Sequence, residues 1–106
     1  MNERHLLEDW LAAHAQGLGP AGLKAVTGRG ADLPDRPRVS WISFETAQAA
    51  GRLTLWSSGR CRSEGTSHGA QPWSTERSVA TTADVDEELR ALTERLDPPA
   101  TRRPAA

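Results

Sequence analysis

The sequence predicts an α+β domain in which an N-terminal and a C-terminal helix pack on one face of an antiparallel meander of three to five strands. Apolar residues recur at helical spacing over residues 3–16 and 82–96, and the segments between them have the composition of strands. The length of 106 residues is typical of one domain. We expect residues 1–97 to form a single domain and residues 98–106 to form a disordered tail.

The N-terminal helix is expected over residues 3–16, because its apolar side chains form one stripe. Gly17 and the glycine-rich run after it are expected to end this helix. A weak strand candidate, Leu23–Thr27, follows, and the charged, proline-containing residues 28–38 are expected to connect it to the next element. The stripe consists of Leu6, Leu7, Trp10, Leu11 and His14.

The best strand candidates are Arg38–Phe44 and Leu53–Ser57. The first has apolar residues on both faces, which is typical of a central strand. The second places its two leucines on one face and Trp56 on the other, because side chains alternate along a strand. We expect Gly51 to serve as the turn residue of the hairpin that joins the two strands.

Two weaker strands and the closing helix complete the fold. Arg60–Thr66 and Trp73–Ala80 have few apolar residues, so they are expected to be edge strands if they are strands at all. The closing helix, Thr82–Leu96, is predicted by apolar residues at i, i+4, i+7 and i+11. Asp84 and Glu87 have the spacing of a capping box. The apolar stripe of this helix consists of Val85, Leu89, Leu92 and Leu96.

Composition excludes several classes of partner. The formal net charge of −1 provides no general field for nucleic acid or an anionic membrane. No run of the chain approaches the roughly 20 apolar residues that a membrane span needs. The first ten residues lack the pattern of a secretory signal, and Cys61 has no second cysteine with which to form an internal disulfide. We therefore expect a cytoplasmic protein, whose oligomeric state the sequence leaves open.

Catalytic and metal-binding constellations are weak. Cys61 lies between Arg60 and Arg62, which would lower its pKa, and His68 could act as a base, but nothing supplies a third, orienting group. We expect no enzymatic activity, no cofactor and no metal site; an enzyme built around Cys61 is the least favoured reading. The spacing of the possible metal ligands in the sequence is not typical of a metal site. These residues are His5, His14, His68 and Cys61.

Arginines beside a tryptophan suggest a second kind of surface. Arg60, Arg62 and Arg77 would form a basic strip beside Trp73 if these strands lie together, and such surfaces bind single-stranded nucleic acid. Acids lie close to the arginines in sequence, among them Glu76. A solvated face of mixed charge is therefore the favoured interpretation, and nucleic acid is not the expected partner.

A family resemblance rests on the order of the elements and on one motif. A helix carrying a tryptophan is followed by a strand of the pattern hydrophobic–Trp–hydrophobic, and an acid-rich helix closes the chain. Between them, residues 51–59, GRLTLWSSG, resemble the G-x-L-x-hydrophobic-W-x-S/T-G strand and turn of the TriTu immunity proteins of bacterial polymorphic toxin systems. Arg60 stands where that family has an acid, and the strands after it are more polar here.

The resemblance implies a cytoplasmic antidote that occupies a cognate toxin domain and blocks it without catalytic residues of its own. The main alternative is a small adaptor or regulatory domain that binds a peptide or nucleic acid through the same sheet face. Trp56 is the favoured anchor, since tryptophan is enriched at interface hot spots. Acids at residues 84–88 are expected to steer a basic toxin weakly. The expected partner-binding residues are Trp56, Trp41, Trp73, Glu45 and Glu64.

Overall fold

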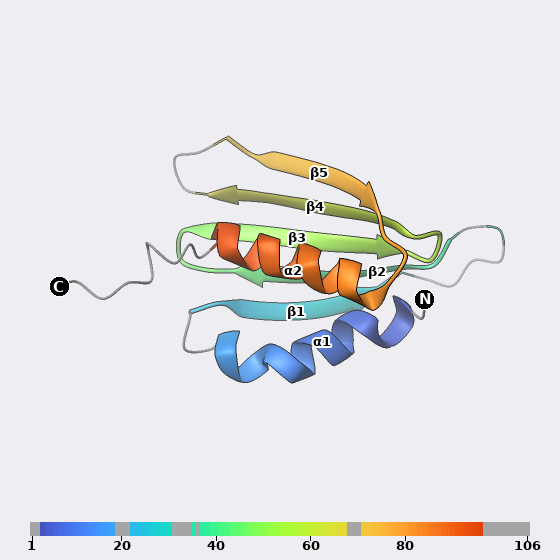
Figure 1. The fold of residues 1–106 in the computed structure, drawn as a ribbon. Helices are drawn as coiled ribbons and strands as arrows, with labels where there is room; N and C mark the ends of the chain where they lie inside the picture. Colours follow the sequence, from blue (N-terminus) through green and yellow to red (C-terminus); the bar gives the residue numbers. More distant parts are fainter. Residues whose placement is uncertain (1–2, 19–21, 31–34, 36, 68–70, 97–106) are drawn as a thin grey trace.

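The computed structural model describes residues 3–18, 22–30, 35, 37–67 and 71–96, and it has the α+β architecture expected from the sequence. The predicted tail, residues 98–106, lies outside the described residues. In chain order the elements are α1 (Glu3–Leu18), β1 (Lys24–Arg29), β2 (Val39–Glu45), β3 (Ala49–Trp56), β4 (Arg60–Ser67), β5 (Trp73–Ser78) and α2 (Thr82–Leu96) (Figure 1).

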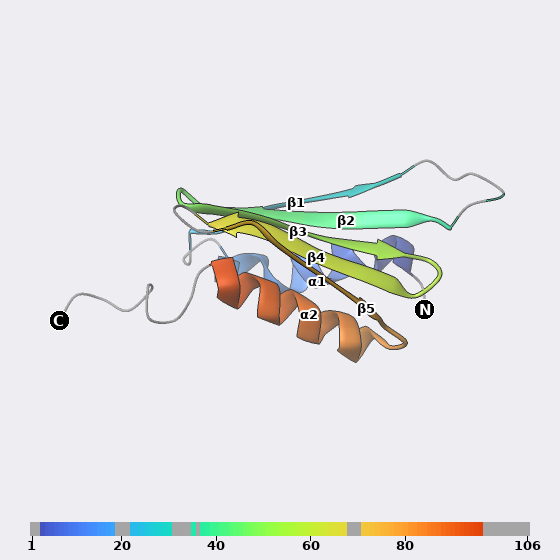
Figure 2. The ribbon, with the colours of Figure 1, turned by 90° about the horizontal axis from the view of Figure 1, so that it is seen from above.

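The strands form one five-stranded antiparallel sheet in the order β1-β2-β3-β4-β5, so each strand pairs with its neighbour in sequence. Helix α1 packs against β1 and β2, and helix α2 packs against β3 and β4. Both helices lie on the same side of the sheet, which is seen edge-on in Figure 2. None of the helices that the structure describes is long and apolar enough to cross a bilayer.

Strand β4 differs from the prediction, because it lies inside the sheet between β3 and β5 rather than at its edge. Its side chains alternate between a buried set, which includes Cys61 and Ser63, and a more exposed set, which includes Arg62 and Glu64. The buried positions are occupied by small residues instead of aliphatic ones. The strand therefore lacks the hydrophobic signal of a central strand although half of it faces the core.

The hairpin between β2 and β3 also differs from the prediction. Its turn is closed by Thr46 and Ala49: the Thr46 amide donates to the Ala49 carbonyl at 2.8 Å, and the Thr46 hydroxyl accepts from the Ala49 amide at 2.9 Å. Gly51 is buried inside β3 and forms no turn. A Cβ atom at this position would lie 3.0 Å from Leu96 Cδ1. The glycine thus allows the last turn of α2 to approach the sheet.

The N-terminus of α2 is capped by a different pair from the one predicted. The Asp84 amide donates to the Thr81 hydroxyl at 3.2 Å, and the Thr81 amide donates back to Asp84 Oδ2 at 3.2 Å. The Ala80 amide donates to the same carboxylate oxygen at 3.0 Å. Thr81 is therefore the capping residue and Asp84 the reciprocal acid of the capping box, so the predicted box of Asp84 and Glu87 is wrong.

The core lies between the sheet and the two helices. Most of its buried side chains are leucine and isoleucine: Leu7, Leu23, Ile42, Leu53, Leu55, Leu89, Leu92 and Leu96. Leu6, Trp10 and Leu11 pack against this core but are only partly buried. Phe44, Cys61, Val79 and Val85 complete it from β2, β4, the segment after β5 and α2.

Trp10 links the two helices. Its indole Nε1–H donates to Asp86 Oδ1 of α2 at 3.0 Å, and the edge of its ring meets Phe44 of the sheet at a centroid distance of 5.9 Å. His14 stacks on the same ring at 4.2 Å but is itself exposed, so its expected place in the buried stripe is wrong. The polar edge of Trp10 explains why this side chain remains at the border of the core.

Candidate functional site

The side of the sheet opposite the helices is the candidate site, and we call it the open face, since no helix that the structure describes covers it (Figure 2). Side-chain alternation determines which residues lie there, because the buried residues of β2, β3 and β4 point toward the helices. The open-face side chains that concern binding are Lys24, Val26, Trp41, Ser43, Glu45, Arg52, Trp56, Arg60, Arg62, Glu64 and Glu76.

Trp41 lies on the open face, where its ring covers a glycine of the neighbouring strand. Its partner in the β1–β2 ladder is Gly28, and a Cβ atom there would lie only 2.5 Å from the indole. The guanidinium carbon of Arg52 lies 5.7 Å from the centroid of the same ring. The indole is half-buried and is held between a strand and a cation.

Trp56 is the second open-face tryptophan, and its predicted orientation away from the two leucines of β3 is confirmed. The guanidinium carbons of Arg60 and Arg62 lie 5.6 and 5.8 Å from its ring centroid. Both arginines bind Glu76, through Nε at 3.0 and 2.8 Å respectively. The hydrogen bonds from Arg60 and then Arg62 hold the pKa of Glu76 below its usual value. Trp56 is half-buried and lies beside this hydrogen-bonded cluster of charges.

Backbone hydrogen bonds close the turn that follows Trp56. The Ser57 amide donates to the Arg38 carbonyl at 2.8 Å, and the Gly59 amide donates to the Trp56 carbonyl at 2.9 Å. The Gly59 carbonyl accepts from the Val79 amide at 2.7 Å. These bonds hold the turn in place and occupy part of its backbone.

Trp73 lies on the helix side of the sheet by its register, although it also borders a hollow at the edge of the open face. As the first residue of β5 it stands opposite Gly65 in the ladder, and its ring lies 4.0 Å from the guanidinium carbon of Arg95 in α2. Arg77, on the same face of β5, bonds Glu88 of α2 at 3.1 Å. The basic strip beside Trp73, which was the less favoured interpretation of the sequence, is not formed, because the register places Arg60 and Arg62 on the face opposite to Trp73 and Arg77.

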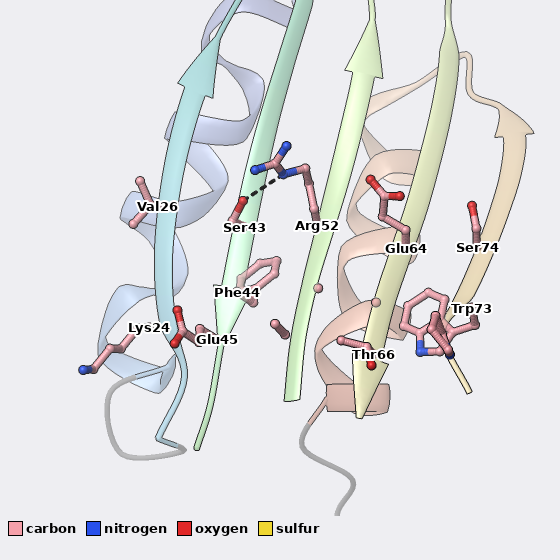
Figure 3. A pocket seen from close by; sticks show the side chains of 14 residues that line it. Lys24, Val26, Ser43, Phe44, Glu45, Arg52, Glu64, Thr66, Trp73 and Ser74 are labelled. Atoms are coloured by element: carbon pink, nitrogen blue, oxygen red, sulfur yellow. Dashed lines mark hydrogen bonds between the residues drawn. The ribbon is translucent and has the colours of Figure 1, made fainter. Parts of the chain in front are cut away.

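Glu45 and Glu64 both lie on the open face, and they border a shallow hollow of about 800 Å³ that crosses the sheet near the β2–β3 turn. Figure 3 shows this hollow with Lys24 and Glu45 on the β1–β2 side and Glu64 over β4. Arg52 stands at its border, and its Nε–H donates to the Ser43 hydroxyl at 3.1 Å. The hollow thus combines small floor residues with charges of both signs.

The acids of α2 are less available for steering a partner than the sequence suggested. Asp84 caps the helix and lies 3.6 Å from Arg77, which also bonds Glu88. Asp86 forms an ion pair with Arg90 at 2.8 Å. Nearby arginines neutralise Asp84, Asp86 and Glu88. We therefore consider the open face the better candidate surface for binding a charged partner.

The thiol chemistry considered for Cys61 is opposed by its surroundings. The side chain is fully buried, and burial, followed by the charge of Glu88, raises its pKa to about 12. The flanking Arg60 and Arg62 point to the other face of the sheet, so they do not lower this pKa as expected. His68 lies outside the described residues. Among the residues that the structure describes, no cluster of three or more His, Cys, Asp or Glu could hold a metal ion.

No family model matches the chain, and neither a curated protein nor a solved structure matches it. What the open face binds must therefore be inferred from its own side chains.

Proposed function

We propose that this protein is an immunity protein of the TriTu kind, which neutralises a cognate bacterial toxin domain by binding it with the open face. One observation carries the proposal: Trp41 and Trp56 lie half-buried on the side of the sheet that no described helix covers, and each is flanked by arginine. Tryptophan and arginine are the residue types most enriched at interface hot spots. The motif at residues 51–59 that resembles the family includes Trp56.

The open-face tryptophans are held in place by their neighbours before any partner binds, which favours tight binding. Trp41 rests on the glycine of β1, and Trp56 rests beside two arginines that Glu76 holds. Side chains that are already restrained lose little conformational entropy on association, so more of the contact energy appears as affinity. A partner that covers both rings would bury a large apolar area without reorganising the sheet.

A nucleic acid is less suited to this face than a protein. Glu76 neutralises much of the charge of Arg60 and Arg62 beside Trp56. The remaining basic side chains of the open face, Lys24 and Arg52, have Glu45 and Glu64 as their partners in the strand ladders. Phosphate groups gain affinity from unpaired cations, which release counterions on binding. A face that carries both signs of charge matches the mixed surface of a protein better than a polyanion.

The test is to search beside this gene for an encoded toxin domain, to purify that domain and to measure its binding by calorimetry, together with rescue of cells that express it. We expect Trp56→Ala to weaken binding at least about thirtyfold, the usual effect of removing a hot-spot tryptophan. Glu94→Ala is the control, since it removes an exposed side chain from α2 on the opposite side of the sheet. Both variants must first show the wild-type circular dichroism and a cooperative melting transition.

Failure of the wild-type protein to bind the toxin would overturn the proposal. A folded Trp56→Ala variant with wild-type affinity would remove Trp56 as the anchor. A labelled single-stranded oligonucleotide, added in place of the toxin, tests the adaptor alternative. Saturable binding of that oligonucleotide at physiological salt, without toxin binding, would favour the alternative.

A further inference from the structure

Among the residues that the structure describes, Arg52 differs from the other open-face arginines in having no acidic partner. Arg29, Arg77 and Arg90 form ion pairs on the helix side, and Arg60 and Arg62 share Glu76 on the open face. Arg52 donates only its Nε–H, to the Ser43 hydroxyl, and its guanidinium lies over Trp41. No carboxylate of the described residues pairs with its two terminal nitrogens.

An acid is nevertheless close in the sheet. Glu64 stands directly opposite Arg52 in the β3–β4 ladder, and facing side chains at such positions have Cβ atoms only about 4.5–5.5 Å apart. In Figure 3 the guanidinium turns toward Ser43 on β2, whereas the Glu64 carboxylate stays over β4. Both charged groups border the hollow, but they do not form a salt bridge with each other, so each is available to a group of opposite charge on a partner.

We propose, on the basis of the function inferred above, that the toxin inserts a complementary ion pair here: a carboxylate against Arg52 and a basic side chain against Glu64. The Ser43 bond and the Trp41 ring already orient the guanidinium, so its terminal N–H groups can grip a carboxylate in a fixed fork. The small residues Ala50 and Gly65 leave room for the incoming side chains. Lys24 and Glu45 at the other end of the hollow add a second basic and a second acidic side chain to its border.

A matched swap of charges tests the polarity of this contact. The double variant Arg52→Glu with Glu64→Arg keeps the composition, the net charge and the cross-strand pair, yet it presents each toxin group with a like charge. We expect toxin affinity to fall on the order of a hundredfold, because like charges across an interface are strongly unfavourable. The control swap, Arg90→Glu with Glu94→Arg, changes an exposed face of α2 and should leave the affinity unchanged.

The neutral variant Arg52→Gln with Glu64→Gln provides a second measurement if the swap lowers the melting temperature. It should also weaken binding, by at least about tenfold, since both charged contacts are lost. Wild-type affinity in a folded swap variant would overturn the inference while the proposed function stands. Absence of toxin binding by the wild-type protein would instead overturn the proposed function.

The swap also distinguishes a toxin from a second copy of this chain. In a symmetric dimer Arg52 would meet Glu64 of the other copy, so a swap made in both copies preserves the attraction. We expect a monomer by sedimentation, with toxin binding lost in the swap variant. A dimer through the open face that persists in the swap variant would overturn the inference.

Discussion

The indole of Trp41 lies directly against Gly28 of the neighbouring strand, so closely that a methyl group at position 28 would stand 2.5 Å from Cζ2 of the ring. The two residues are ladder partners in β1 and β2. Trp73 covers Gly65 in the same way at the other edge of the sheet, on the opposite face. At both edges a large aromatic ring shields the backbone of a glycine that has no side chain to pack.

Gly28→Ala should therefore destabilise the protein by about 1–3 kcal/mol, the usual cost of overpacking, because the Trp41 ring must move away from the sheet. In a Trp41→Phe background the smaller ring leaves room, and the same alanine should cost clearly less. Urea unfolding of the four proteins in this double-mutant cycle measures the coupling. Equal effects of the alanine in both backgrounds would contradict the contact.

Leu89→Ala should lower the free energy of unfolding by about 2–5 kcal/mol, because Leu89 is fully buried between α2 and the sheet. Glu94→Ala, on the exposed side of the same helix, should change it by less than about 0.5 kcal/mol. Thermal or chemical denaturation followed by circular dichroism makes the comparison. Similar values for both variants would show that α2 is not docked through Leu89.

Asp84 should make stability depend on pH in the acid range. The hydrogen bond from the Ala80 amide, with further bonds from Thr81, holds the pKa of this carboxyl below its ordinary value of 3.8. Its contribution is therefore present above the unfolded-state pKa and is lost as pH falls through the folded-state pKa. Asp84→Asn should be less stable than wild type near neutral pH, and the difference should shrink as pH falls below the ordinary pKa of 3.8.

Unfolding midpoints measured across this pH range check the prediction for Asp84. Glu94→Gln is the control, because it removes a carboxylate from the exposed surface of the same helix. A constant difference between Asp84→Asn and wild type at every pH would show that the charge of the capping carboxylate contributes nothing.

Cys61 should be unreactive in the folded protein. With its pKa raised to about 12 by burial, the thiol stays protonated near pH 8, and reagents need the thiolate. Ellman's reagent should react slowly with the native protein and at once in concentrated urea. Rapid modification of the native protein would show that the space between β4 and α2 opens readily.

Local patterns in the sequence were enough to predict the helices, the strands β2 and β3, and the side of β3 on which Trp56 lies. Apolar residues three or four apart on a helix, or two apart on a strand, must share a face whatever they pack against. The stripes of α2 and the leucines of β3 are buried for that reason. The outward orientation of Trp56 follows from the same alternation.

Only the tertiary structure decided the position of β4, the face of Trp73 and the role of Gly51. Small residues such as Cys61 and Ser63 give β4 no hydrophobic signal, yet pairing on both edges makes it central. The register of β5 against β4 turns Trp73 toward α2, and close approach of the last turn of α2 requires glycine at position 51. Each of these features depends on which segment lies opposite, and that is determined by packing between elements distant in the sequence.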